Sequence, residues 1–210
     1  MTKALLARKI GMTQVYDEEG RVIPVTVLQA GPCYVVQVKD SSRDGYNSIQ
    51  IGFGEIKEHR VNRPLKGHYQ KHNLRPCRYL REFRVEDPAA FSSGQELRAD
   101  LFSPGDLVDV SAVTRGKGFA GSIKRLGFAR GAMAHGSHYH RGPGSLGAIT
   151  AARVFKGRLL PGRMGGKRRT IQNLRVVQAD GEKNILLVKG AVPGPQGGLV
   201  VIKAAVKRKG

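Results

Sequence analysis

Three histidines lie within the segment HGSHYH (residues 135–140), a density that could support metal binding. Imidazoles are common zinc ligands, but a zinc site usually takes a further ligand from a cysteine or a carboxylate. The nearest cysteine is Cys77, and residues 110–179 contain no acid. Imidazoles can also stack on bases or hydrogen-bond to phosphates and 2′-hydroxyls, and Tyr139 adds another ring. We predict no metal here, and RNA contact or simple solvent exposure remain the alternatives.

The segment GRMGGKRRT (residues 162–170) resembles a phosphate-binding P-loop. The P-loop pattern would require glycine where Pro161 stands and serine or threonine where Arg168 stands, so nucleotide hydrolysis is not indicated. A run of three cations, Lys167 to Arg169, is instead expected to clamp phosphate, and the alternative is a solvated charge run.

Catalysis by other chemistries has little support in the sequence. No carboxylate in the basic stretch could orient a histidine or hold Mg²⁺. A cysteine–histidine pair has no local signature at Cys33 or Cys77. We therefore predict no enzyme activity, no cofactor and no small-molecule substrate.

Charge is the strongest signal in the chain. Residues 110–179 hold fourteen Lys and Arg, thirteen of the 28 glycines and no Asp or Glu. The whole chain has 36 basic and 16 acidic residues, a net +20, whereas the remainder carries 22 minus 16, or +6. A one-sign surface repels itself, and glycine permits close backbone approach to a partner. This stretch therefore indicates contact with a polyanion, most simply a nucleic acid.

Composition limits the remaining classes. No apolar run approaches the roughly 20 residues that a membrane span needs. The start, MTKALLARKIGMTQ, lacks the apolar region of a secretory signal, so a cytoplasmic location and two free thiols are expected. Glycines interrupt the basic stretch too often for a long amphipathic helix, and no membrane partner is predicted.

Outside the basic stretch, apolar residues repeat with a period of two, which predicts short strands around residues 25–27, 36–38, 49–53, 108–110, 185–188 and 199–202. Turn signals such as Asp44-Gly45 and Asp180-Gly181 separate them. This pattern is typical of a small β-barrel or sandwich. The strands before residue 111 and after residue 175 are expected to form one sheet system, with the basic stretch inserted between them.

Two segments remain open or mixed in their interpretation. Residues 57–84 are basic and polar, and form either a solvated excursion or a second RNA-facing patch. Starting at Phe119, three apolar residues fall at i, i+4 and i+7, which predicts a short helix. Its apolar face is expected to pack on the barrel, while Lys124 and Arg125 point outward.

Several of these segments resemble the universal large-subunit ribosomal protein family "L-three" in its bacterial form. The resemblance is carried by LLARKIGMTQVYDEEGRVIPVTVLQAGP, GDLVDVSAVTRGKGFAGSIKR, HRGPGSLG, RVFKGRLLPGRMGGKRRTIQNLRVV and NILLVKGAVPGPQGG, in order along nearly the whole chain. One difference is that Ala148 to Thr150 follow Gly147, where many bacterial relatives carry a glutamine.

The resemblance implies a mainly β fold, with a small closed barrel similar to translation-factor barrels, a short helix and a long basic loop. Residues 1–110 and 175–210 would form the barrel, with 57–100 as an excursion, and 111–174 the extension. The family binds large-subunit rRNA near its 3′ end, nucleates early assembly, contacts neighbouring ribosomal proteins and extends a loop toward the peptidyl transferase centre.

The residues expected to contact RNA form the base, tip and return of the extension. They are Arg115, Lys117, Phe119, Lys124, Arg125, Arg130, His135, His138, Tyr139, His140, Arg141, Gly144, Arg153, Lys156, Arg158, Arg163, Lys167, Arg168 and Arg169. A free RNA-binding regulator or chaperone is the alternative function, and an RNA-modifying enzyme is a third.

Overall fold

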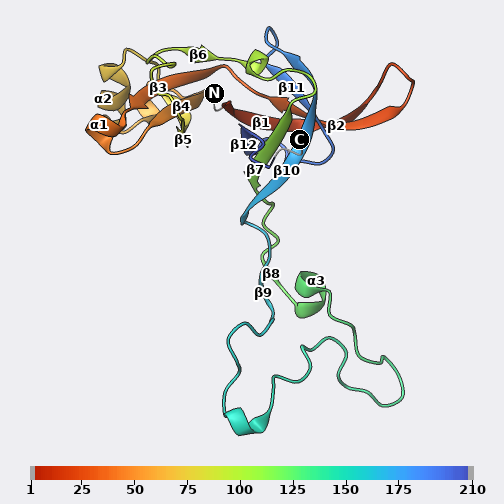
Figure 1. Cartoon of the computed structure of the whole chain (residues 1–210). Coiled ribbons are helices and arrows are strands. Elements are labelled where there is room, and N and C mark those ends of the chain that lie inside the picture. The colour runs from red at the N-terminus through yellow and green to blue at the C-terminus, as the bar shows by residue number, and fades with distance from the viewer. Residues whose placement is uncertain (1–2, 208–210) are drawn as a thin grey trace. The chain divides into compact units, whose positions relative to one another are not determined.

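The computed structural model describes residues 3–207, which divide into two compact units (Figure 1). One unit, called the globular unit below, holds the chain up to Val113 and again from Arg168 onward. The other unit, called the extension, is Thr114–Lys167. Strands of the globular unit therefore run into both ends of the range 111–174 that the sequence suggests for the insertion.

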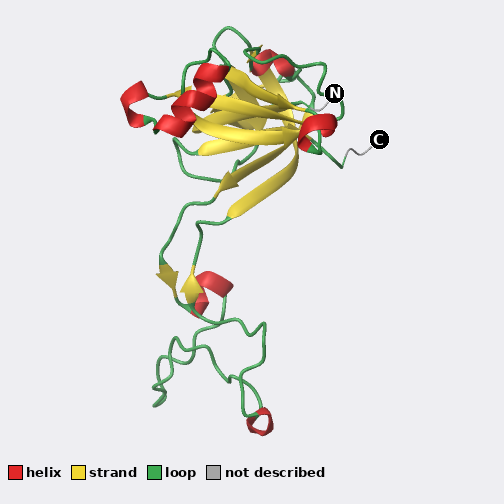
Figure 2. Cartoon of the chain, turned by 90° about the vertical axis from the view of Figure 1, so that its left-hand side faces the viewer, coloured by secondary structure: helices red, strands yellow, loops and turns green. Residues whose placement is uncertain are grey.

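Six antiparallel strands close into a barrel in the globular unit (Figure 2). In order around the barrel they are β1 (Ala4–Tyr16), β12 (Leu199–Ala204), β7 (Leu107–Val113), β10 (Arg168–Asp180), β11 (Ile185–Lys189) and β2 (Val22–Gln29). The predicted fold class, mainly β with a small closed barrel, is confirmed.

The period of two accounts for the barrel interior. In β12, Val200 and Ile202 are fully buried, whereas Leu199 and Val201 between them are only partly buried. Side chains of a strand alternate between faces, so a closed barrel places every second residue inside.

A second antiparallel sheet corrects the expectation of a single sheet system. It has the order β5 (Cys77–Arg84), β4 (Ser48–Glu55), β3 (Cys33–Lys39) and β6 (Glu96–Leu97). The predicted strands at 36–38 and 49–53 belong to this sheet and not to the barrel. Strand periodicity shows which face is apolar but does not identify the neighbouring strand, which explains the error.

Of the segment 57–84, residues 77–84 form strand β5 of this second sheet, and the residues before them fold against it. After a 3-10 turn, η1 (Glu58–Arg60), the helix α2 (Arg63–Lys71) begins at Asn62, whose side chain accepts a hydrogen bond from the backbone nitrogen of Leu65 at 3.1 Å. Tyr69 is buried, and its hydroxyl donates to the carbonyl of Cys77 at 3.1 Å. The helix is thereby tied to the start of β5.

One hydrophobic cluster joins the barrel and the second sheet. It contains Leu5 and Val110 from the barrel together with Ile51 and Phe83 from the sheet. The thiol of Cys33 also lies in it and donates to the carbonyl of Leu6 at 3.2 Å. The sheet is therefore packed on the barrel as part of the same globular unit.

The two cysteines, Cys33 and Cys77, are free thiols, as the sequence predicts. Within residues 3–207, no helix combines the length and the apolar character needed to cross a membrane. The remaining short helices of the globular unit are α1 (Ser41–Asp44) and the 3-10 turn η2 (Ala99–Leu101).

Regular structure is sparse in the extension. Its elements are β8 (Phe119–Ala120), α3 (Ser122–Leu126), the 3-10 turn η3 (Ile149–Ala151) and β9 (Gly162–Arg163). Residues 127–148 contain neither helix nor strand.

Candidate nucleic-acid interface

A ladder of backbone hydrogen bonds joins the outgoing and returning chains of the extension. The backbone nitrogen of Thr114 donates to the carbonyl of Lys167 at 3.0 Å, and that of Lys117 donates to the carbonyl of Met164 at 2.9 Å. Farther along, Phe119 pairs with Arg163 in the two-stranded sheet of β8 and β9. We call this paired segment, residues 114–120 with 162–167, the stem.

Close backbone approach in the stem requires glycine at one position. Gly165 has φ +72°, and a Cβ atom there would lie 2.0 Å from the carbonyl oxygen of Arg115. No side chain fits at that distance, so the returning chain can approach Arg115 only because residue 165 has none.

The stem presents its cations to solvent. Arg115, Lys117, Arg163 and Lys167 are all exposed, because the backbone and not the side chains makes the ladder. Arg168 and Arg169 follow on β10, paired with Val113 and Ala112, and are also exposed. The structure thus brings together cations from both ends of the extension.

The helix near the stem differs from its prediction. It begins at Ser122, and Phe119 lies outside it in β8 with 76% of its surface exposed. Lys124 is exposed as expected, but Arg125 is half-buried, and its guanidinium donates to the carbonyl of Leu160. Arg125 therefore holds the returning chain against the helix. Packing of the helix on the barrel stays a prediction.

The histidine segment is held by contacts with its own backbone. The nitrogen of Gly131 donates to the carbonyl of His140 at 3.0 Å, and Nδ1 of His140 lies 2.8 Å from the carbonyl oxygen of Ala132. His135 and His138 are exposed. Among residues 3–207, no three His, Cys, Asp or Glu side chains form a group that could hold a metal.

Two loops of the extension are cross-linked by Arg158, whose Nη2 donates to the carbonyl of Ser145 and, at 3.4 Å, to that of Pro143. The hydroxyl of Tyr139 accepts a hydrogen bond from the nitrogen of Gly144. The guanidinium of Arg153 lies 5.6 Å from the ring centroid of Phe155. Arg130, Arg141 and Lys156 are exposed. The predicted residues therefore spread along the extension and do not converge on one pocket.

Exposed apolar side chains are the part of this surface that the charge pattern does not reveal. Ile149 is 96% exposed, and Met133, Phe155 and Leu159 are more than half exposed. In the sequence, the only sign of these exposed side chains is that apolar residues occur within a stretch that contains no acid. The Phe155 ring is suited to stacking on an RNA base, and the aliphatic side chains are suited to close apolar packing.

Ion pairs between basic and acidic side chains occur in the globular unit. Within the described residues, all five ion pairs, for example Lys39 with Glu82 at 3.0 Å, lie there. Asp109, the last acid before the basic stretch, is buried and accepts from the backbone nitrogens of Asn173 and Val206 at 3.0 and 3.3 Å. It therefore supports a bulge of β10 and does not neutralise the extension.

Comparison with known proteins identifies the family. The model of the ribosomal protein L3 family matches residues 84–184. The chain is 61% identical to the large ribosomal subunit protein uL3 of Carboxydothermus hydrogenoformans over 209 residues, with all of both chains covered. The chain belongs to the ribosomal protein L3 family. The uL3 proteins of Pelotomaculum thermopropionicum and Desulfitobacterium hafniense are 59% and 58% identical, over all of this chain and 100% and 99% of theirs. The predicted resemblance is confirmed, and this is a family of ribosomal proteins and not of enzymes.

Proposed function

We propose that this protein is a structural component of the large ribosomal subunit in the cytoplasm and binds the rRNA of that subunit. The main support is full-length similarity to relatives that are named as proteins of that subunit. Neighbouring ribosomal proteins are its further partners, and it needs no cofactor for this role.

The extension is the proposed RNA-binding element. Apart from the half-buried Arg125, its cations are exposed, and the extension contains no acid, so phosphate is a suitable counter-charge for them. In this proposal Arg115, Lys117 and Lys124 bind RNA at the base. Arg125 acts differently, by fastening the returning chain to α3.

The finer role follows from the family resemblance. The protein binds near the 3′ end of the large-subunit rRNA, acts early in assembly, and directs residues 137–153 toward the peptidyl transferase centre. Gly144, exposed and at φ +77°, has open space where a Cβ atom would lie, which suits close approach to RNA.

Crosslinking in cells, followed by mapping of the RNA attached to residues 115–170, tests this function directly. We expect adducts with large-subunit rRNA and retention of the protein on the particle in a high-salt wash. Release by that wash, with adducts spread over messenger RNAs, would instead support the free regulator or chaperone.

A further inference from the structure

The globular unit contains a cavity of about 530 Å³ between the barrel and the second sheet. Its walls come from the ends of several strands, with Arg8 on β1, Gln29 on β2, Phe53 on β4, and Arg78 and Tyr79 on β5. This size falls in the range of small-ligand sites, which hold roughly 300–1,000 Å³. We call it the Tyr79 cavity.

A second cavity of about 430 Å³ adjoins the first, because Tyr79 and Leu199 line both. It adds the cations Arg81, Arg168 and Lys203. The two cavities are therefore neighbours, and all of their lining residues belong to the globular unit.

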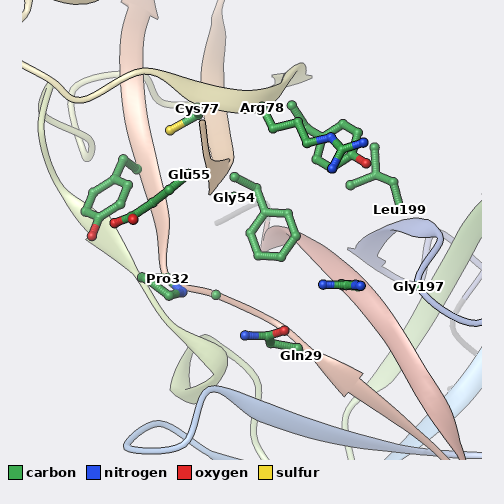
Figure 3. A pocket seen from close by; sticks show the side chains of 13 residues that line it. Gln29, Pro32, Gly54, Glu55, Cys77, Arg78, Gly197 and Leu199 are labelled. Atoms are coloured by element: carbon green, nitrogen blue, oxygen red, sulfur yellow. The ribbon is translucent and has the colours of Figure 1, made fainter. Parts of the chain in front are cut away.

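Charge on the walls of the two cavities is poorly neutralised. Within the part of the chain that the structure describes, none of the five cations Arg8, Arg78, Arg81, Arg168 and Lys203 belongs to an ion pair. Of the two acids in the walls, Glu82 is already engaged by the hydroxyl of Ser48 at 2.6 Å and the ammonium of Lys39 at 3.0 Å. The other, Glu55, lies across the Tyr79 cavity from Arg78 (Figure 3). An anionic ligand is therefore favoured on the Arg78 side.

Aromatic rings accompany these cations. The guanidinium of Arg78 lies 5.4 Å from the ring centroid of Tyr79, and the ammonium of Lys203 lies 5.1 Å from that of Phe83. Cation–π contacts of this kind hold a charge in place without consuming its hydrogen-bond donors. Tyr79 is only partly buried and lines both cavities, so part of its side chain faces them.

Hydrogen-bonding groups complete the walls. Burial, with smaller contributions from Glu96 and Glu55, raises the pKa of the Tyr34 hydroxyl, which remains a donor at neutral pH. Gln29 supplies an amide, and Glu55 supplies an acceptor on the side away from Arg78. These groups match the edge of a nucleobase or a 2′-hydroxyl.

We propose that the Tyr79 cavity receives one unpaired RNA nucleotide, with its phosphate at Arg8 and Arg78 and its base against Tyr79, and that the adjoining cavity carries the strand onward. The inference rests on the proposed RNA binding and adds a second, globular contact site for unpaired RNA. A double helix is too wide for this cavity, whereas stacking of single bases on aromatic rings is common in single-strand binding.

The test measures binding of the full-length protein to a labelled single-stranded uridine oligonucleotide and to an RNA duplex of equal length. We expect Tyr79→Ala to weaken single-strand binding by about tenfold and duplex binding far less, while Tyr79→Phe keeps wild-type affinity. Arg78→Gln should weaken binding and lower the magnitude of the log–log salt slope by about 1. Arg43→Gln, at an exposed arginine of α1 outside both cavities, is the matched control.

Folding is checked separately, because Tyr79 also packs on the core cluster. Arg78 is exposed, so its substitution is not expected to affect folding. Wild-type affinity in both Tyr79→Ala and Arg78→Gln, or equal losses for single strand and duplex, overturns the inference. If those variants bind normally while Arg141→Gln and Lys156→Gln in the extension lose affinity, only the cavity is wrong. Absence of RNA binding by the wild-type protein would overturn this inference and the proposed function together.

Discussion

The carbonyl oxygen of Lys167 accepts two hydrogen bonds from Thr114, one from its backbone nitrogen at 3.0 Å and one from its hydroxyl at 3.1 Å. These two residues are the first and last of the extension, so this contact closes it at its base. The hydroxyl is also within 3.3 Å of the Lys167 nitrogen.

Replacing Thr114 with valine should loosen the stem and leave the barrel intact. The substitution removes the hydroxyl contacts and keeps the side-chain shape, so local opening should become easier by about 1 kcal/mol. Amide exchange at Lys117 and Gly166 measures this opening. Thr170→Val is the matched control, since the Thr170 hydroxyl lies 2.7 Å from that of Ser111 within the barrel. Unchanged exchange in the stem of Thr114→Val would contradict the assignment.

Gly165→Ala should disrupt the stem far more strongly. The new methyl group would collide with the Arg115 carbonyl, and alanine disfavours the φ of +72°. We expect a marked loss of large-subunit incorporation without a change in the thermal midpoint of the isolated protein. Gly116→Ala has no atom within 4 Å of the added group and serves as the control. Equal incorporation of the two variants would show that stem geometry is unimportant.

Binding to large-subunit RNA should depend steeply on salt. If about half of the fourteen cations in residues 110–179 each meet a phosphate, the log–log slope should be about −5 to −6. Filter binding at several salt concentrations gives the slope. A value near about −1 would mean that most of these charges stay solvated.

Base and tip of the extension should respond differently to substitution. Lys117→Glu reverses a charge that we propose to bind phosphate, and it should reduce the yield of subunits. Gly144→Asp alters only the tip, and should change antibiotic response and peptide-bond formation more than assembly. Subunit yield and drug sensitivity are measured in parallel for both. A block of assembly by Gly144→Asp as severe as that by Lys117→Glu would refute the tip assignment.

The Cys33 thiol should contribute a pH-dependent share of stability. Burial raises its pKa from an ordinary value of 9.0 to about 12. Because the raised pKa belongs to the folded state, the contribution is complete below pH 9.0 and is lost as the pH rises toward 12. The difference in free energy of unfolding between wild type and Cys33→Ala should therefore shrink by about 1.4 kcal/mol per pH unit in this window. A pH-independent difference, measured by urea unfolding at pH 8 and pH 10, would contradict this.

Sequence periodicity predicts four of the six barrel strands, β2, β7, β11 and β12, but misses β1 and β10. It also misses the elements of the second sheet in which exposed residues dominate. In β5 only Phe83 is fully buried among polar and basic neighbours, so no alternation is visible. The helix α2 shows no clear apolar periodicity either. Its start does carry a recognisable signal, because Asn62 precedes a proline in the first turn. The strand β5 depends on pairing with β4, and α2 depends on contact with the start of β5; local sequence encodes neither partner.

For the candidate interface, the charge pattern of the sequence identifies the basic segment. It does not show which cations are available to RNA and which hold the chain together. Nothing in the sequence distinguishes Arg125 from the other basic residues, yet its guanidinium donates a hydrogen bond to the Leu160 carbonyl. Phe119 fits the helical spacing but lies in a strand, because the backbone ladder with Arg163 outcompetes helix formation there. Both outcomes depend on residues about forty positions away in the chain.

Pairing of β7 with β10 has an entropic consequence for RNA binding. These strands carry the outgoing and returning chains, with Val113 opposite Arg168, so the barrel has already joined the two ends of residues 114–167. Closing a flexible loop of that length costs about 3–4 kcal/mol, by the logarithmic dependence on chain length. Folding of the globular unit bears that cost before any RNA is present. Binding to RNA then has to order residues 114–167 along one path, but it does not have to bring their two ends together.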